Sequence, residues 1–254
     1  MIPKKIHYCW FGRNPIPPKT KKYIDSWKKH CPDYEIVKWS EDNYDIEKHP
    51  YMKKAYTEKK WSFVSDYARL DIIYNEGGIY LDTDVELLKP LDFVLNEKAF
   101  FARENEEFIT TGLGFGAERH NSVVKMLRDM YDDQQDFITC PYLVTKGLCE
   151  MGFELSDKFQ SINKISVYSK EVFNPFDFKT GTVSITENTV SINHYAGSWM
   201  SMSKKMRIGI SRLGRRIFGM SRYEKMKKFV GGGTAKEVVF PNIPTFQYVL
   251  GEVL

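Results

Sequence analysis

Hydrophobic residues recur at spacings of three and four between Trp61 and Glu76, which predicts one amphipathic helix. Its apolar positions are Phe63, Tyr67, Leu70, Ile73 and Tyr74. The pair Gly77-Gly78 supplies a stop signal for this helix. A short apolar run at residues 79–81 follows and leads directly into Asp82-Thr83-Asp84. The pattern therefore predicts a helix, a tight turn and a buried strand that ends at two acids.

Further runs of apolar and β-branched residues predict the remaining elements. Strands are expected at residues 4–10, 34–39, 99–102, 113–117, 162–168 and 183–193, and helices at 20–30, 123–131 and 142–151. Alternating strands and helices in the first half favour an α/β fold, with a mostly parallel sheet flanked by helices. Binding sites of such sheets lie at the carboxyl ends of the strands, where Asp82 and Asp84 are expected.

The two acids have the chemistry of a metal site. Side chains alternate along extended backbone, so Asp82 and Asp84 are expected to point to the same side. Two carboxylates are hard oxygen ligands that suit Mg²⁺ or Mn²⁺, with positions left for phosphate oxygens and water. A D-x-D alone occurs by chance roughly once in a few hundred residues. A solvated turn after a strand is therefore the competing interpretation.

The helix in front of the acids strengthens the functional interpretation. Asp66 and Arg69 are three residues apart and share one helical face. An arginine beside a diphosphate and an aspartate that receives sugar hydroxyls are what a nucleotide-sugar site needs. The alternative is an ion pair within the helix, on the surface.

These residues carry a family resemblance. The run Ser65-Asp66-x-x-Arg69, followed by Gly77-Gly78-x-Tyr80-Leu81-Asp82-x-Asp84, closely resembles glycosyltransferase family 32. That family contains DXD sugar transferases, among them bacterial capsular-polysaccharide enzymes and fungal mannosyltransferases, and it is related to the clostridial toxin glucosyltransferases. The opening residues 2–12 and the late run His194-Tyr195-x-Gly197-Ser198-Trp199 are similar to its first strand and its closing element.

The resemblance implies a GT-A fold with a Rossmann-like sheet, a retaining reaction and a set of residue roles. Donor binding would involve Trp10, Tyr80, Asp66, Arg69, Asp82, Ser198 and Trp199, with Trp10 stacked on the base and the last two residues on the leaving phosphates. Asp84 would be the main metal ligand, Asp82 would reach ribose and metal, and His194 would approach the metal or the diphosphate. Asp66, Arg69, Asp82 and Asp84 would carry catalysis. Trp10 and Trp199 have a simpler alternative as core residues.

The function so implied is transfer of a hexose from a nucleotide-sugar donor to a glycan or lipid-linked acceptor, in capsular or other surface polysaccharide synthesis. A UDP-hexose is favoured over GDP-mannose as the donor, with Mn²⁺ or Mg²⁺ as the cofactor. Two rivals use the same residues. One is a metal-dependent nucleotidyltransferase or phosphohydrolase, and the other is a sugar-nucleotide or glycan-binding module without catalysis.

The charge of the chain is concentrated in one segment. The net charge is +4, yet residues 203–228 contain ten Lys and Arg against one acid, Glu224. We expect a catalytic domain at 1–200 and a basic helical extension at 201–254. Apolar residues interleave with the cations, which is typical of a helix on an anionic membrane surface. A solvated basic helix is the alternative, and no nucleic-acid partner is expected.

The remaining features concern the compartment. No run approaches the roughly 20 apolar residues of a membrane span, and the first residues lack a signal-peptide layout. The four cysteines form no C-x-x-C pair, which favours free thiols. The expected location is the cytoplasm, with peripheral attachment at the inner face of the plasma membrane.

Overall fold

The computed structural model describes residues 1–177 and 180–195 and, beyond them, residues 206, 209–213, 215, 217, 219 and 222. The chain divides into two compact units, Met1–Ser201 and Met202–Leu254. Ser198 and Trp199, to which the family resemblance gives donor-binding roles, lie outside the described residues.

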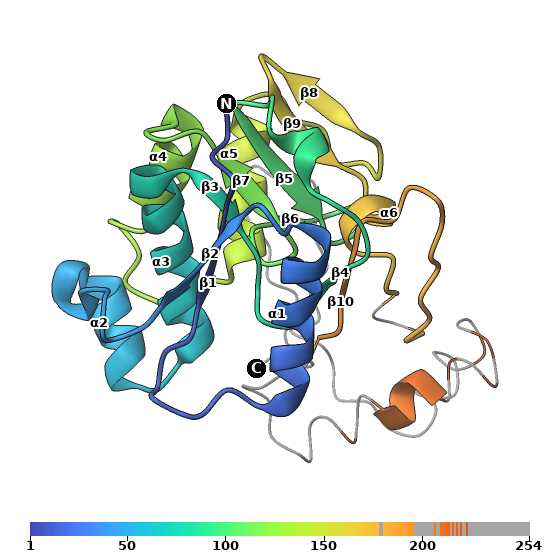
Figure 1. The fold of residues 1–254 in the computed structure, drawn as a ribbon, viewed down its shortest axis with the longest axis horizontal. Coiled ribbons are helices and arrows are strands. Elements are labelled where there is room, and N and C mark those ends of the chain that lie inside the picture. Colours follow the sequence, from blue (N-terminus) through green and yellow to red (C-terminus); the bar gives the residue numbers. More distant parts are fainter. Residues whose placement is uncertain are drawn as a thin grey trace. The chain divides into compact units, whose positions relative to one another are not determined.

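The first unit is built on a mixed sheet of eight strands in the order β2-β1-β3-β7-β5-β9-β8, with β6 paired to β5 (Figure 1). The strands are β1 (Lys5–Cys9), β2 (Glu35–Trp39), β3 (Gly78–Tyr80), β5 (Ala99–Arg103), β6 (Ile109–Thr110), β7 (Phe115–Ala117), β8 (Gln160–Ile162) and β9 (Ile165–Tyr168). A separate two-stranded sheet pairs β4 (Val85–Leu87) with β10 (Ser191–Asn193).

The direction of the strands agrees with the expected fold. Strands β2 and β3 are parallel to β1, and β9 is parallel to β5. Strand β7 is antiparallel to both β3 and β5, so these two run in the same direction. Strands β2, β1, β3, β5 and β9 therefore share one direction, and the predicted α/β fold is confirmed.

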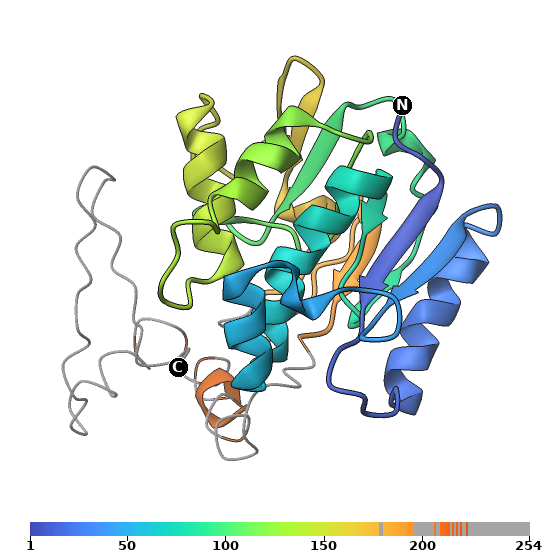
Figure 2. The same ribbon diagram turned by 90° about the vertical axis from the view of Figure 1, so that its left-hand side faces the viewer.

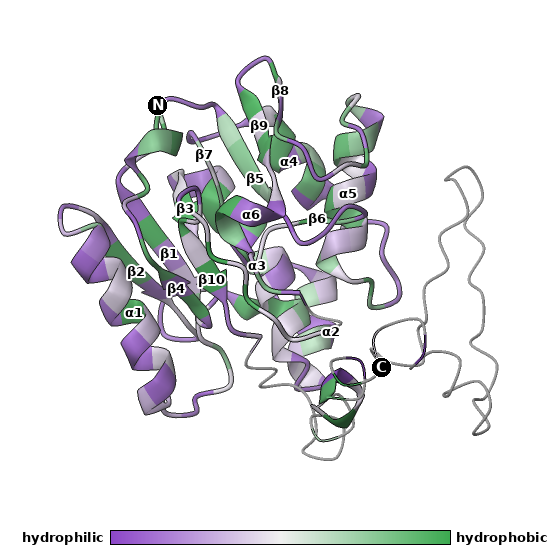
Figure 3. Ribbon diagram, turned by 90° about the vertical axis from the view of Figure 1, so that its right-hand side faces the viewer, coloured by the Kyte–Doolittle hydropathy of each residue, from purple (hydrophilic) through white to green (hydrophobic). Residues whose placement is uncertain are grey.

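Helices cover both faces of this sheet (Figure 2). One face carries α2 (Pro50–Thr57), α3 (Trp61–Glu76), α4 (Ser122–Asp129) and α5 (Cys140–Glu150), and the other carries α1 (Pro18–His30) and α6 (Lys170–Phe173). Two short 3-10 helices, η1 (Ile46–Lys48) and η2 (Asp92–Val94), lie in the connections. Successive strand residues point to opposite faces, so Tyr80 belongs to the α3 core and Ile79 to the α1 core. Figure 3 shows the apolar strands beside the more polar α1.

The turn from α3 into β3 depends on two glycines. Gly77 and Gly78 have φ of 66° and 99°, a region that side chains with a Cβ rarely adopt. The Gly77 N–H closes the helix on the Ile73 carbonyl at 2.9 Å. A Cβ on Gly78 would lie 2.9 Å from His7 Nε2. The two glycines therefore allow the chain to pass directly from α3 into β3, which lies between β1 and β7 in the sheet.

The prediction of a strand at 183–193 is wrong for most of these residues. Only β10 (Ser191–Asn193) and an isolated bridge at Val183 are extended and paired. The Thr186 side chain accepts a bond from the Asn188 N–H, and the Thr189 N–H bonds the Thr186 carbonyl. Such local side-chain bonds compete with a strand ladder, so the β-branched run folds into a turn.

Two further predictions concern chain chemistry. All four cysteines are free thiols, as predicted. Among the described residues, the helices are too short or too polar to cross a bilayer.

Candidate functional site

The site lies where β3 ends, beneath α3. Strand β3 lies between β1 and β7, and Leu81 still bonds to the β1 backbone through the His7 carbonyl at 3.1 Å. Tyr80 and Asp82 are two residues apart, so both face α3. The Tyr80 hydroxyl donates to Asp82 Oδ1 at 3.1 Å. Strand alternation thus brings one acid of the D-x-D under the helix.

Arg69 connects the helix to that acid. Its Nη2 atom lies 3.1 Å from Asp66 Oδ1 and 3.2 Å from Asp82 Oδ1. The guanidinium also lies over the Tyr80 ring, with 4.9 Å between Cζ and the ring centroid. The Arg69 side chain is only 5% exposed, so the pair with Asp66 is not the surface ion pair that the sequence left open.

Arg69 also bonds to two other residues, Ser65 and Thr111. Nε donates to the Ser65 carbonyl at 3.0 Å and Nη2 to the Ser65 hydroxyl at 3.1 Å. Nη1 lies 3.5 Å from the hydroxyl of Thr111, which in turn contacts the Cys140 thiol at 2.8 Å. Charge-assisted bonds of this kind fix a planar guanidinium. Arg69 is therefore placed to hold Asp82 in position.

Burial and charge set the ionisation of the site. The pKa of Asp82 is raised to about 7, because burial and the nearby charge of Asp84 raise it by more than the Arg69 guanidinium lowers it. Burial also raises the pKa of Asp66 to about 6, against Arg69 and the Cys140 backbone. Burial lowers the pKa of Arg69, but the charges of Asp82 and Asp66 outweigh it and the pKa is raised. The acids are thus poised to ionise fully when positive charge approaches.

The sequence predicted extended backbone at Asp84, but the structure places this residue in a turn. The Val85 N–H bonds the Asp82 carbonyl at 3.0 Å, so the chain reverses between the two acids. The two carboxylates still interact, because the charge of Asp84 raises the pKa of Asp82. Asp82 and Asp84 are therefore close to each other, as predicted, but a turn and not an extended strand brings them together.

A loop residue that the sequence did not single out packs directly against Asp82. The Gly112 carbonyl accepts the Asp82 N–H at 3.1 Å. A Cβ on Gly112 would lie 2.4 Å from Asp82 Oδ2 and 3.3 Å from Arg69 Nη1. Only glycine leaves room for the carboxylate there. The signal was present in the glycine-rich run at 111–116, but spacing alone did not link it to Asp82.

His194 meets the site through its backbone. Its N–H bonds the Asp84 carbonyl at 2.9 Å, next to the β4–β10 pairing. Its imidazole lies 2.7 Å from Glu86 Oε2 and stacks on Tyr23 at 4.5 Å between ring centroids. In this structure the ring nitrogen Nε2 thus faces Glu86.

Trp10 lies at the end of β1, partly buried against the α1 core. Its indole N–H donates to the Asn14 carbonyl. The indole is thus anchored at its polar end while part of the ring remains accessible, an arrangement open to both the stacking and the core role.

The donor chemistry of Asp82 and Asp84 fits a divalent cation. Both are hard oxygen ligands, and a cation bound by two carboxylates takes its other ligands from phosphate oxygens and water. Within residues 1–177 and 180–195, no cluster of three or more His, Cys, Asp and Glu side chains has the arrangement of a metal site.

Known proteins match this part of the chain. Residues 17–101 match the family model described as "Glycosyltransferase sugar-binding region containing DXD motif". This range covers α1 through most of β5 and includes Asp66, Arg69, Asp82 and Asp84.

Curated relatives match over partial lengths. Inositol phosphoceramide mannosyltransferase 3 of Schizosaccharomyces pombe is 29% identical over 140 residues, covering 51% of this chain and 37% of that protein. The initiation-specific alpha-1,6-mannosyltransferase of Candida albicans is 26% identical over 129 residues, covering 46% and 34%. The chain thus spans about a third of the length of these relatives. Among solved structures, the PaToxG glycosyltransferase is 19% identical with a TM-score of 0.48, covering 59% of this chain and 70% of that one.

The matched region and the relatives support a DXD-containing glycosyltransferase.

Proposed function

We propose that this chain is a metal-dependent glycosyltransferase that moves a hexose from a nucleotide sugar to a glycan or lipid-linked acceptor. The observation that carries the proposal is the 3.2 Å contact between the buried Arg69 and the partly exposed Asp82, inside the region that matches the DXD sugar-binding model. It joins the helix and the D-x-D into one rigid charged centre.

The roles divide by position. Asp84 and Asp82 would hold Mn²⁺ or Mg²⁺, which when bound offsets the negative charge that develops on the leaving diphosphate. Arg69 and the Tyr80 hydroxyl keep Asp82 Oδ1 oriented. Asp66, 11% exposed and bonded to Arg69, would meet the sugar hydroxyls. Because these groups are fixed before the donor arrives, little reorganisation is needed during transfer.

The donor is proposed as a UDP-hexose or GDP-mannose. The metal chemistry fits both, since each presents a diphosphate. The names of the relatives, which include mannosyltransferases, make GDP-mannose the donor to test beside the UDP-hexoses. We also propose retention of the anomeric configuration and a role in surface polysaccharide synthesis, both from the family resemblance.

A donor screen tests the proposal. Thermal shift with each nucleotide sugar, with and without Mn²⁺, should show metal-dependent stabilisation by one donor in wild type and not in Asp84→Asn. Transfer to acceptor or water would then release the nucleoside diphosphate, and NMR of the first product would report its anomer. Release of pyrophosphate or nucleoside monophosphate would indicate nucleotidyl transfer or phosphohydrolysis instead. Binding without turnover on any acceptor would indicate a binding module.

We further propose that the basic segment 203–228 attaches the protein to an anionic membrane surface at the cytoplasmic face. In the second unit, Met206, Ile210, Leu213 and Ile217 recur at helical spacing and are 57–64% exposed. An apolar stripe flanked by cations suits the bilayer interface. Vesicle sedimentation tests this. Wild type should bind anionic but not neutral vesicles, and Leu213→Ser with Ile217→Ser should abolish binding, whereas Lys146→Glu with Lys158→Glu in the first unit should not. Undiminished binding by the Leu213→Ser, Ile217→Ser variant would contradict attachment through the stripe, and no binding by wild type would indicate a solvated basic helix.

A further inference from the structure

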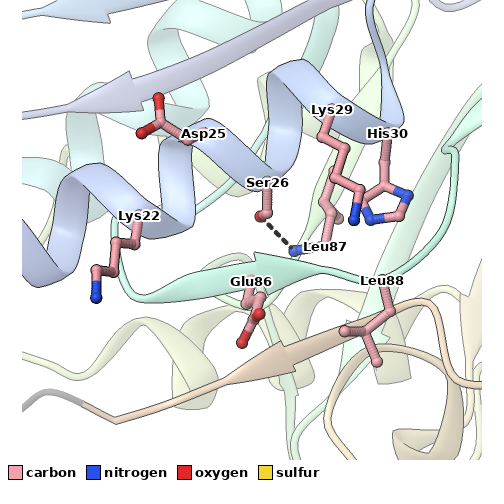
Figure 4. Close-up of a pocket in the computed structure, with 8 residues that line it drawn as sticks. All are labelled: Lys22, Asp25, Ser26, Lys29, His30, Glu86, Leu87 and Leu88. Carbon is pink, nitrogen blue, oxygen red and sulfur yellow. Dashed lines mark hydrogen bonds between the residues drawn. The ribbon is translucent and has the colours of Figure 1, made fainter.

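A pocket of about 500 Å³ lies between α1 and β4 (Figure 4). Its lining residues are Lys22, Asp25, Ser26, Lys29, His30, Glu86, Leu87 and Leu88. The volume is within the range of about 300–1,000 Å³ that small-molecule sites occupy. The pocket belongs to neither the Arg69 cluster nor the D-x-D turn.

The two walls of this pocket are fixed to each other. The Trp27 indole N–H donates to the Val85 carbonyl at 2.8 Å, and the Leu87 N–H donates to the Ser26 hydroxyl at 2.9 Å. Trp27 is fully buried, so these bonds anchor the helix to the strand from inside. These bonds hold the backbone of the two walls in place, and the exposed Lys22 and Lys29 side chains project from it.

The charges in the pocket are unequally satisfied. Asp25 pairs with Lys28 at 3.1 Å, and Glu86 contacts the His194 imidazole at 2.7 Å. Within the described part of the chain, no acid lies at ion-pair distance from Lys22 or Lys29. In Figure 4 the Asp25 carboxylate lies on the side of α1 away from β4. The acids are thus occupied by neighbours while the ammonium groups remain for a ligand.

Helix energetics explain only part of this arrangement. Lys29 and His30 lie in the last turn of α1, where cations favourably oppose the helix dipole. Lys22 lies two turns earlier, where the dipole gives no such advantage. At a rise of about 1.5 Å per residue, Lys22 and His30 are separated by roughly 12 Å along the helix. Figure 4 shows Lys22 at one end of the pocket and Lys29 and His30 at the other, so the cations flank the space that an anionic group would occupy.

The pocket is next to the proposed transfer centre. Strand β4 begins one residue after Asp84, and Glu86 lines the pocket. Glu86 also holds His194, whose backbone bonds the Asp84 carbonyl. Tyr23 of α1 stacks on the same imidazole. One short strand and one histidine therefore connect the D-x-D turn to this pocket.

We propose that the pocket between α1 and β4 binds an anionic group of the acceptor, a phosphate monoester or diester, through Lys22, Lys29 and His30. The identity of the ligand as an acceptor rests on the proposed glycosyltransferase function, whereas phosphate binding by the pocket does not depend on that function. Ammonium groups recognise phosphate as point charges, and the imidazole adds a directed donor. The phosphate can belong to a soluble sugar phosphate or to a lipid headgroup.

A binding experiment with matched variants tests the site without catalysis. The full chain is titrated calorimetrically at constant ionic strength with inorganic phosphate, with a sugar phosphate and with glycerophosphoglycerol, the water-soluble headgroup of phosphatidylglycerol. Lys22→Gln with Lys29→Gln removes the pocket charges. Lys19→Gln with Lys21→Gln removes the same charge from exposed positions of the same helix that do not line the pocket. Metal-dependent hydrolysis of the donor without acceptor is measured for each protein.

The pocket variant should bind the phosphate probe at least about tenfold more weakly, as expected for losing charge-assisted contacts, and the control variant should match wild type. Tighter binding of the sugar phosphate would identify a soluble source, and tighter binding of glycerophosphoglycerol a lipid source. Equal loss in both variants, or no binding by wild type in either arm, would overturn the proposal. Donor hydrolysis should be unchanged in both variants. Its absence in wild type would contradict the transferase function, but the phosphate-binding result would still test the pocket.

Discussion

Arg69 and Asp82 meet at 3.2 Å across the boundary between α3 and the end of β3, and this contact organises the site. The arginine is 5% exposed and the aspartate 32%, so one partner is anchored in the core while the other reaches the solvent. The helix thereby positions an acid that a cation and a donor can approach.

Replacing Arg69 by alanine should lower both stability and turnover. Asp66 and Asp82 would lose their shared positive charge, and breaking a buried pair costs roughly 3 kcal/mol of unfolding free energy. The rate per folded molecule should fall at least about tenfold, or about 1.4 kcal/mol of transition-state stabilisation. Chemical unfolding and transfer kinetics measure the two effects.

The control for this change is Arg128→Ala. Arg128 pairs with the buried Asp71 at 3.3 Å, away from the D-x-D. The Arg128→Ala variant should be less stable than wild type but should keep the same transfer rate per folded molecule. If Arg69→Ala behaved in the same way, Arg69 would be a structural ion-pair partner only.

Asp84→Asn should abolish transfer and leave the fold intact, because it removes a charged metal ligand from a partly exposed turn. The melting temperature in the absence of metal should match wild type, and Asp42→Asn at an exposed position should be neutral in both assays. Activity above about a tenth of wild type at saturating Mn²⁺ would contradict the assignment of Asp84 as the main ligand, because the loss of such a group exceeds 1.4 kcal/mol.

Gly112→Ala should impair activity although the residue has no functional side chain. The added Cβ would lie 2.4 Å from Asp82 Oδ2, a distance that forces the carboxylate or the loop to move. Metal affinity measured by calorimetry should fall together with the transfer rate. Gly209→Ala, where nothing lies within 4 Å of the new Cβ, is the matched control. Wild-type metal affinity in Gly112→Ala would show that the loop yields without cost.

Stability in the absence of metal should fall as the pH rises from about 5 to about 7.5. The folded-state pKa values of Asp66 and Asp82, about 6 and about 7, lie above the ordinary 3.8. Between these values the native state holds more protons than the unfolded state, so raising the pH favours unfolding. Thermal melts across this range measure the slope.

Mn²⁺ should reverse this trend, because it binds the ionised carboxylates. Its stabilising effect should be larger at pH 7.5 than at pH 5.5. Asp82→Asn should flatten the pH dependence without metal and weaken the effect of Mn²⁺. A wild-type melting temperature that rises through this pH range would mean that these two acids are not protonated in the native state.

The sequence by itself determined the elements around the site and the residues within it. The three- and four-residue spacing predicted α3 over its observed bounds, and the glycine pair located its end, because both signals are local. The chemistry of Asp66, Arg69, Asp82 and Asp84 followed from residue type and order. The roles assigned to Ser198 and Trp199 stay predictions, as does the metal contact of His194.

Only the tertiary structure decided which distant groups complete the site. Gly112 is 30 residues from Asp82 along the chain, and Thr111 is 42 from Arg69, so no local pattern joins them. The same holds for the α1–β4 pocket, which depends on Trp27 reaching Val85 across 58 residues. Periodicity reports which face of an element is apolar, whereas the packing of that face selects the partners. The sequence therefore determined the ligands of the proposed centre, and the fold determined how they are held.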